Sequence, residues 1–244
     1  MGRGPSSSAP ADGGREGVRV LRPWARCLGA VALIAASLYA GRTFLLSSAG
    51  SFLVIDDQVQ KADRILVVDA DRTIDQAAEL YRAGVAARLL VIQRRLERLE
   101  KLGLRPAYHD RTASGLCARG VPEEALTVIP GKALTDWDEA RALDGWMAHD
   151  PAASVAVLCD RFHSREVRYI MDKVLGPAKA RRLQMLPAAC RTYDETNWWR
   201  HRLGILDFFR AYVRLGFVRV NGEDREAWRE WDPKSYEMTL PRRR

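Results

Sequence analysis

An uninterrupted apolar run, Val155–Cys159, is the feature that most constrains how this chain can fold. A short apolar run bounded by polar turn residues is typical of a strand buried on both faces of a parallel sheet. The residues that follow, Ser164–Val174, predict a helix, because apolar side chains recur there three or four apart on one face. In open sheets of this kind, ligands bind where strands end and helices begin. His163 and Arg165 therefore occupy the place where function is expected.

The same alternation of strand and helix is predicted for the rest of the chain after the N-terminal segment. Further strands are predicted by similar apolar runs: Arg64–Asp69, Arg88–Ile92, Ala125–Ile129 and Arg182–Leu186. Further helices are predicted between and after them: Thr73–Ala83, Gln93–Gly103, Arg111–Arg119, Asp136–His149 and Trp198–Val218. Strands that alternate with helices imply a parallel sheet with right-handed crossovers. We therefore expect residues 50–220 to form an α/β domain, a Rossmann-like three-layer α/β sandwich with a mainly parallel sheet.

Ahead of this body lies an apolar segment of twenty residues, Cys27–Leu46, in which Arg42 is the one charged residue. Twenty residues at helical rise cover about 30 Å, the thickness of a bilayer core, which predicts a transmembrane helix over residues 27–48. Five arginines and two acids precede the segment within residues 1–26, and residues 47–52 carry no arginine. The positive-inside rule then predicts a disordered basic tail in the cytoplasm and an extracytoplasmic body.

Two other interpretations of this segment remain open. A cleaved signal peptide would use Cys27–Ala40 as its apolar core, although Leu38 at the minus-three position makes Ala40 a mediocre cleavage residue. A soluble cytoplasmic enzyme would need residues 27–46 to be buried core, which the basic lead-in disfavours. The uncleaved anchor is favoured because the length and flanks fit a membrane span better than a signal core.

The net charge of +8 invites a nucleic-acid interpretation, but the charge lies mostly at the two ends. Residues 1–26 carry +3 and Arg242–Arg244 carry +3, which leaves +2 on residues 27–241. A nucleic-acid platform needs its basic surface on the folded domain. We therefore expect no nucleic-acid partner, and we interpret residues 221–244 as a polar C-terminal extension.

The four cysteines form no CxxC or Cys/His pattern, so no metal site is expected from them. Isolated cysteines usually behave as small hydrophobic residues. In an extracytoplasmic body Cys117 and Cys190 could pair, and the sequence leaves this open.

Four phrases taken together resemble one family. They are LVIDDQVQKADRILVVDAD (53–71), AAELYRAGVAARLLVI (77–92), GVPEEALTVIPG (120–131) and RFHSRE (161–166). Their order and spacing resemble the bacterial envelope family of YdcF, SanA and ElyC over residues 50–220. The resemblance implies the same Rossmann-like fold on a single-pass anchor in the bacterial inner membrane. It also implies a role in cell-envelope biogenesis or integrity, with a phosphorylated envelope precursor or nucleotide-like molecule as ligand.

The chain departs from the family at its loops. Where the family has a glycine-rich turn after the first strand, this chain reads Asp69-Ala70-Asp71-Arg72, and carboxylates there would repel an anion. Of the family's Asn-Thr-x-Glu-Asn motif, only an acidic residue is matched here, at Asp138. The Phe-His-x-Arg motif is present at residues 162–165. These losses leave a second interpretation, a non-catalytic envelope factor that binds or scaffolds.

His163 is the first candidate for chemistry. At the start of a helix after a buried strand, its imidazole could act as a general acid or base. Arg165 could bind a phosphate or carboxylate, and Phe162 is a candidate ligand contact in the same phrase. The structural alternative is that Asp160 caps the helix and His163 is a polar residue of its first turn.

Acidic residues follow the first strand as well. Asp69, Asp71 and Arg72 are candidate ligand-binding residues, and the two carboxylates could bind a divalent ion if other groups converge on them. The alternative is a turn in which aspartate makes local backbone hydrogen bonds. The sequence names no metal, and the cofactor is left unknown.

A third group of candidates follows the third strand. Thr135 with Asp138 three residues later forms a capping box, and acids such as Asp136 and Glu139 are favoured by the helix dipole there. Parallel strands bring their carboxyl ends to one crevice, so we predict that Asp138 joins His163 as a catalytic residue. Thr135 and Glu139 are predicted to bind ligand.

Trp198 is the last candidate. It resembles the family's aromatic stretch before the closing helix, where an aromatic face could pack on a ligand ring. The alternative is a core tryptophan. GxGxxG, P-loop, HExxH and GxSxG motifs are absent from the sequence.

Overall fold

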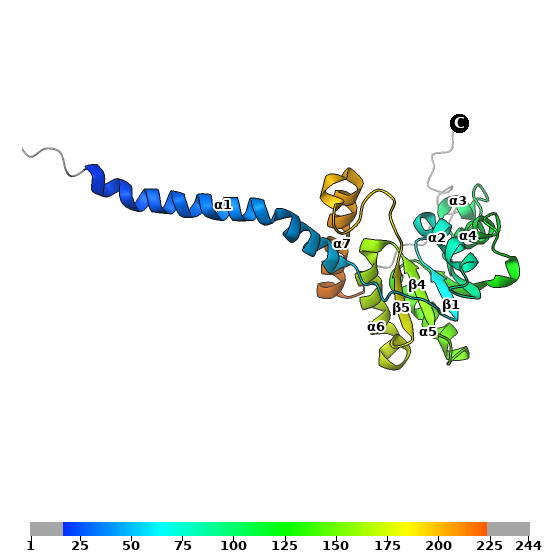
Figure 1. Cartoon of the computed structure of the whole chain (residues 1–244). Helices are drawn as coiled ribbons and strands as arrows, with labels where there is room; N and C mark the ends of the chain where they lie inside the picture. The colour runs from blue at the N-terminus through cyan, green and yellow to red at the C-terminus, as the bar shows by residue number, and fades with distance from the viewer. Residues whose placement is uncertain (1–16, 224–244) are drawn as a thin grey trace, which may run out of the picture. The chain divides into compact units, whose positions relative to one another are not determined.

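The computed structural model describes residues 17–223, and the body in that range is built on one sheet of five strands (Figure 1). The strands are β1 (Arg64–Val67), β2 (Arg88–Arg94), β3 (Leu126–Ala133), β4 (Val155–Cys159) and β5 (Leu183–Pro187). Their order is β3-β2-β1-β4-β5, and every neighbouring pair is parallel. The predicted α/β class with a parallel sheet is confirmed.

The chain reverses its direction across the sheet between β1 and β4. It places β2 and β3 on one side of β1, then returns to place β4 and β5 on the other side. At such a switch point the connections after the two central strands diverge and leave a crevice at the carboxyl edge. The residues that follow β1 and β4 therefore border this crevice.

β4 lies at the centre of the core, and all five of its residues are buried. Ala156 lies between Ile65 of β1 and Gln184 of β5. Alternate residues of the strand enter opposite layers, so that Ala156 packs in one core cluster and Val157 in the other. A strand covered on both faces requires an apolar residue at every position, which explains the unbroken run.

Helices cover both faces of the sheet, which gives the expected three layers (Figure 1). α2 (Ala70–Arg82) and α4 (Tyr108–Cys117) contribute to one apolar cluster. α5 (Asp136–His149), α6 (Ser164–Ala180) and α7 (Arg202–Asn221) contribute to the cluster on the other face.

The helix predicted over Gln93–Gly103 is mostly wrong. β2 continues to Arg94, because it pairs with β3 beyond a register shift, and α3 covers only Arg98–Lys101. A capping box at Glu97 begins this single turn, and Gly103 lies just beyond its end with φ 69. Leucines three residues apart were not sufficient to extend the helix.

The predicted closing helix is divided in two. A 3-10 turn, Trp198–Arg200, comes first, and His201 is extended (φ −123, ψ 128) before α7 begins. α6 runs past its predicted end to Ala180, with a kink at Gly176 (φ 69) before Pro177. The remaining elements lie where predicted with bounds shifted by a few residues, and a 3-10 turn, Glu123–Ala125, leads into β3.

α1 (Gly17–Leu53) contains the predicted anchor. Within it, Cys27–Leu53 is long and apolar enough to cross a membrane, with a mean hydropathy of 1.5, and its apolar part is exposed. Gly50 and Leu53 at its end are buried. The helix could therefore anchor the chain in a membrane. The described residues divide into two compact units between Leu46 and Ser47.

The predicted tail and extension fall partly outside the described residues. Residues 17–26 are helical and not disordered. Residues 1–16 of the predicted tail and residues 224–244 of the predicted extension lie outside the description.

Candidate functional site

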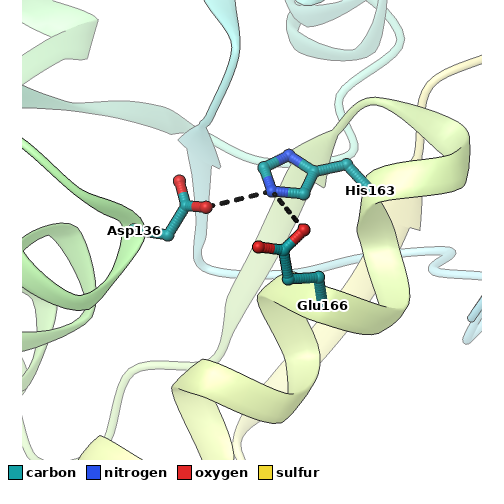
Figure 2. A group of neighbouring side chains, drawn as sticks. All are labelled: Asp136, His163 and Glu166. Atoms are coloured by element: carbon teal, nitrogen blue, oxygen red, sulfur yellow. Dashed lines mark hydrogen bonds and ion pairs between the residues drawn. The ribbon is translucent and has the colours of Figure 1, made fainter. Parts of the chain in front are cut away.

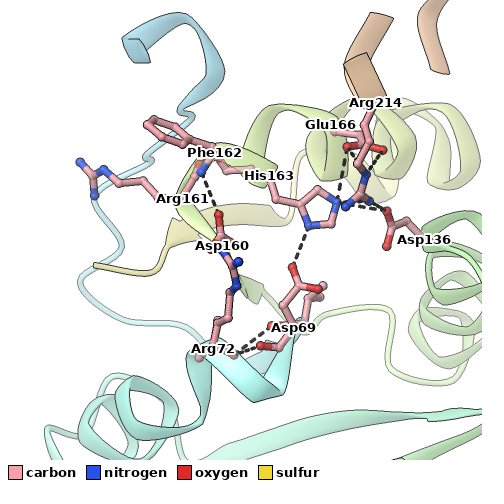
Figure 3. Close-up of polar contacts among 12 residues, drawn as sticks. Asp69, Arg72, Asp136, Asp160, Arg161, Phe162, His163, Glu166 and Arg214 are labelled. Carbon is pink, nitrogen blue, oxygen red and sulfur yellow. Dashed lines mark hydrogen bonds and ion pairs between the residues drawn. The ribbon is translucent and has the colours of Figure 1, made fainter. Parts of the chain in front are cut away.

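The crevice at the carboxyl edge collects polar side chains from several elements. Asp69 precedes α2, the 3-10 turn Arg161–His163 follows β4, Asp136 begins α5 and Arg214 belongs to α7. Asp69 adopts the left-handed conformation, with φ 54 and ψ 46. Aspartate is one of the few residues that visit this region with a short polar side chain. Figure 3 shows the side chains of Asp69 and Asp136 directed at the imidazole of His163 from opposite sides.

His163 lies at the centre of this group and is only 6% exposed. Its Nδ1 is 2.7 Å from Oδ2 of Asp69, and its Nε2 is 3.1 Å from Oδ2 of Asp136. The turn that carries it is held by Asp160, whose carboxylate accepts a hydrogen bond from the backbone N–H of Phe162. Both ring nitrogens therefore have a carboxylate partner.

Glu166 and Arg214 complete the network around Nε2. Oε2 of the buried Glu166 lies 3.6 Å from Nε2 of His163, one turn along α6. Figure 2 shows Asp136 and Glu166 both meeting this nitrogen. Nη2 of Arg214 lies 2.7 Å from Oδ2 of Asp136, and its Nε lies 3.1 Å from Oε2 of Glu166. One guanidinium thus joins α5, α6 and α7.

These charges set the protonation of His163. Burial lowers the pKa of the imidazole, but the hydrogen bonds and charges of Asp136 and Asp69 outweigh burial and raise the pKa to about 10. Burial raises the pKa of Asp136, whereas His163 and Arg214 lower it to about 2. Nη2 of Arg214 also lies 2.8 Å from Nε2, a contact that is a hydrogen bond only when Nε2 carries no proton. The carboxylates prevail, so His163 is a cation at neutral pH.

A second buried pair supports the β2 side of the crevice. Nε of Arg94 lies 2.7 Å from Oε1 of Glu139, and the guanidinium carbon lies 4.1 Å from the ring centre of Tyr108. The Tyr108 hydroxyl accepts a hydrogen bond from the backbone N–H of Ala70 at 2.9 Å. Burial raises the pKa of Glu139 to about 7, against the opposing charge of Arg94. This pair therefore fixes the start of α2 beside the crevice.

An ion network ties α2 to α7 on the other side. Nη1 of Arg72 lies 2.8 Å from Oδ2 of Asp160 and 2.8 Å from Oδ2 of Asp207. The Tyr193 hydroxyl donates a hydrogen bond to the same carboxylate of Asp207. Arg72 is therefore held by two carboxylates that come from the end of β4 and from α7.

An open pocket of about 220 Å³ lies between these networks. It is lined by Asp69, Asp71, Arg72, Arg94, Tyr108, Asp160, Phe162, His163, Glu166, Asp207, Arg210, Ala211 and Arg214. Charges of both signs alternate around it. The four arginine side chains in the pocket wall keep between 31% and 64% of their surface exposed, so each can reach a bound molecule.

Five of the predicted site residues line this pocket together: Asp69, Asp71, Arg72, Phe162 and His163. A sixth, Glu139, is buried against Arg94, which is itself a pocket residue. The expectation that Asp69 would repel an anion needs correction. Its carboxylate is bound to the cationic His163, so its charge is neutralised within the network.

Asp138 and Thr135 do not reach the pocket, contrary to the expected convergence with His163. Asp138 accepts hydrogen bonds from the backbone N–H groups of Leu134 and Thr135 and pairs with Arg141. Thr135 accepts from the backbone N–H of Asp138, which completes the capping box. The structural alternative therefore accounts for both residues.

Arg165 and Trp198 also lie away from the pocket. The Arg165 side chain donates to the backbone carbonyl of Phe52 and lies over the Phe52 ring. Trp198 is 3% exposed and stacks on Phe208 with the ring centres 3.6 Å apart, so it is a core residue. Cys117 and Cys190 are free thiols.

Sequence reasoning missed several residues that the structure places at the site. Asp136 was present in the predicted acidic group but was passed over for Asp138. Glu166 follows His163 by three residues, a spacing that puts both on one helix face and could have revealed it. Arg94 and Arg214 carried no local signal, because strand pairing and helix packing bring them to the crevice.

Asp136, His163 and Glu166 are residue types that hold metal ions, and their ligand atoms lie within 4.8 Å of one another. Arg214 lies among the same atoms and supplies the positive charge there. Within residues 17–223 this group is therefore a network of ion pairs, and a metal ion would have to displace Arg214.

The arrangement can bind an anion and can present a proton to it. The arginines offer several N–H donors, and the imidazolium of His163 holds a proton at the pocket wall. The carboxylates keep these cations in fixed positions, which removes the entropy cost of ordering them on binding. No model of a known protein family matches this chain, and no curated protein matches it either.

Proposed function

We propose that this chain is a single-pass protein of the bacterial inner membrane whose extracytoplasmic domain binds a phosphorylated or nucleotide-like ligand. Its role would lie in the biogenesis or integrity of the cell envelope, where peptidoglycan or surface polysaccharide precursors carry phosphate. The resemblance to the YdcF, SanA and ElyC family supports this role. The apolar helix Cys27–Leu53 and the arginines that precede it support the compartment.

The observation that carries the proposal is the group of arginines that carboxylates hold around the pocket at the switch point of the sheet. Arg72, Arg94, Arg210 and Arg214 reach it from three elements, and His163 adds a fifth positive charge. Guanidinium groups bind phosphate through paired N–H donors. A hydrogen bond to a charged group contributes about 1.5–3 kcal/mol, so three of them contribute about 4.5–9 kcal/mol, a range that includes the roughly 8 kcal/mol of a micromolar complex.

Arg210 is the first residue that a ligand would meet. Its side chain is 64% exposed, and its nearest carboxylate atom, Oδ1 of Asp207, is 3.6 Å away. The other three arginines are each held by a carboxylate at 2.8 Å or less. Arg210 can therefore turn toward an anion at the lowest cost in free energy, and it takes the anion-binding role that was predicted for Arg165.

His163 would act as a proton donor to an oxygen of the ligand. A free imidazole is mostly neutral at pH 7, whereas the two aspartates keep this one charged. Phe162 and Tyr108 also line the pocket, but they are only 3% and 9% exposed and offer little aromatic surface to a ligand ring.

A second candidate function is binding without catalysis. The observation that favours it is that both ring nitrogens of His163 are already bound to carboxylates, at 2.7 Å and 3.1 Å. A general acid must release its proton to the substrate, and two carboxylates oppose that release. Under this alternative the domain would recognise an envelope ligand and serve as a scaffold.

Calorimetric titration of the full chain in detergent with inorganic phosphate and with uridine diphosphate tests the proposal. We expect binding of one or both probes, weakened about tenfold by Arg210→Gln, since one charge-assisted hydrogen bond is lost. Arg165→Gln is the matched control, because it removes an arginine outside the pocket and should leave the affinity unchanged.

Wild-type protein that binds neither probe, or two arginine variants that lose affinity equally, would contradict the proposal. His163→Gln separates the two candidate functions. A catalytic role requires that this variant bind the probe but fail to restore envelope integrity in a deletion strain. A purely binding role requires that it restore integrity fully.

A further inference from the structure

α7 is apolar on two opposite sides. One side faces the core through Gly204, Phe208, Ala211, Leu215 and Val218, which are all buried. The other side carries an exposed stripe, which we define as Leu206, Phe209, Val213, Phe217 and Val220. These five residues recur at intervals of three and four, so they share one face of the helix. A helix that is apolar on its outer side needs a partner for that side.

The exposed charged residues of α7 itself have one sign. Arg202, Arg210 and Arg219 are exposed on α7, and the one acidic residue of the helix, Asp207, is buried in the contact with Arg72. An exposed helix face that combines aromatic and aliphatic residues with arginine, and that lacks acids, is typical of helices that lie in a membrane interface. Arginine guanidinium groups would then meet anionic lipid headgroups.

The stripe continues onto neighbouring elements. Val213 and Phe217 line a mostly apolar pocket of about 470 Å³ between α5, α6 and α7, together with Leu134, Trp137 and Ile170. The charged residues Asp136, Glu166 and Arg214 also line it. Leu134 is itself 48% exposed. The apolar surface is therefore wider than one helix, and it opens beside the stripe.

The end of the candidate membrane span packs directly on α7. The Tyr212 hydroxyl donates a hydrogen bond to the backbone carbonyl of Ala49 at 2.9 Å, and the Tyr212 ring stacks on Phe52 with centres 6.0 Å apart. Gly50 lies against Trp198, whose ring stacks on Phe208 of α7. All of these residues belong to the unit 47–244, so the helix that would leave a bilayer does so at the side of α7.

We propose that the exposed stripe of α7 lies on the surface of the bilayer that holds α1, as a second membrane contact. This inference rests on the membrane anchoring in the proposed function and adds to it a fixed docking of the domain on lipid. The partner is an anionic bilayer surface, since the stripe is flanked by arginines and adjoins the end of the span. A second copy of the chain is the rival occupant.

Photo-crosslinking of the full chain in nanodiscs tests this docking. Phe209 and Val213 in the stripe are replaced one at a time by p-benzoylphenylalanine, which keeps an apolar side chain at each exposed position. Phe44, exposed within the candidate span, is the reporter of anchoring. Glu124, exposed in the turn before β3, is the control outside the stripe. Melting curves before irradiation confirm that each variant is folded.

We expect lipid adducts at positions 44, 209 and 213 and none at 124. The yield at 209 and 213 should rise about threefold or more when phosphatidylglycerol is added to phosphatidylcholine, because the flanking arginines favour anionic lipid. Adducts at 44 but not at 209 or 213 would overturn the docking and leave the anchor intact. Crosslinks from 209 or 213 to a second chain would assign the stripe to a dimer. No adduct at 44 would overturn the anchor and the docking together.

Discussion

Asp69 shows how one backbone conformation organises the site. Its φ of 54 lies in the region that glycine occupies most easily, at the turn where the resembled family carries glycines. Here an aspartate takes the strained conformation and uses its carboxylate to hold Nδ1 of His163. The turn therefore presents a charged side chain to the pocket.

We expect the protonation of His163 to make the stability of the folded chain depend on pH. Its pKa of about 10 in the folded chain lies above the ordinary value of 6.5. The folded state therefore binds the proton more tightly, and the stabilisation is complete below pH 6.5 and lost as the pH rises toward 10. We expect the urea midpoint of the wild-type chain in detergent to fall across this window more steeply than that of His163→Gln. Parallel curves would show that the aspartates do not hold the proton.

Arg214 is expected to keep metal ions out of the network. Replacing it with methionine removes the cation that lies among Asp136, His163 and Glu166, and leaves three ligand atoms facing one another. We expect Mn²⁺ to raise the melting temperature of Arg214→Met by several degrees through preferential binding to the folded state. Arg210→Met, which removes a pocket arginine outside this group, should show no such shift. If Mn²⁺ raised the melting temperature of the wild-type protein as well, Arg214 would not be what keeps metal ions out.

At the residue scale the sequence could locate the centre of the site but not its partners. His163 follows a recognisable buried strand, and Asp69 follows another. Asp138 does not face the crevice because its carboxylate belongs to the capping box, and Asp136 contacts His163 instead. Arg214 is 51 residues from His163, and only the packing of α7 brings the two together.

At the scale of elements, α7 depends on a close approach to the turn before it. A Cβ added to Gly204 would lie 2.5 Å from the carbonyl oxygen of Trp198, whereas a Cβ on Gly216 would meet nothing within 4 Å. We expect Gly204→Ala to destabilise the chain by about 1–3 kcal/mol through overpacking. Gly216→Ala on the same helix should stabilise it by about 0.5–1 kcal/mol. Thermal unfolding of both variants is the measurement, and equal shifts would contradict the packing.

Local signals predicted some elements better than others. α5 matches its predicted bounds at both ends. Its start could be predicted because Thr135 and Asp138 form a capping box that can be recognised in the sequence. The helix predicted after β2 failed because the pairing of Arg94 with Ala133 of β3 extends the strand. Such pairing is decided by a segment far along the chain, and no local pattern reveals it.

At the scale of the whole molecule, the alternation of strands and helices was sufficient to predict a parallel sheet. It was not sufficient to predict the strand order, because several right-handed arrangements satisfy the same alternation. The order matters for function, since the switch between β1 and β4 decides which loops border the crevice.

We expect α1 to hold the chain in a membrane, with the domain outside the cytoplasm. After an alkaline carbonate wash the full chain should stay in the membrane pellet, because Cys27–Leu53 would remain in the bilayer. Protease added to intact spheroplasts should degrade the domain if it lies outside the cytoplasm. A protein released by carbonate would favour a soluble chain, and protection in spheroplasts would reverse the orientation.

Val213 and Arg214 are consecutive residues of one helix, one in the outer stripe and the other in the ion network. Because α7 is rigid, any rotation of the helix caused by lipid contact at Val213 would also move Arg214. The Arg214 guanidinium would then shift between Asp136 and Glu166. If the stripe rests on the bilayer, ligand affinity and membrane composition become thermodynamically linked, and the linkage acts equally in both directions. Through α7, the ligand affinity of the domain would then respond to the composition of the membrane.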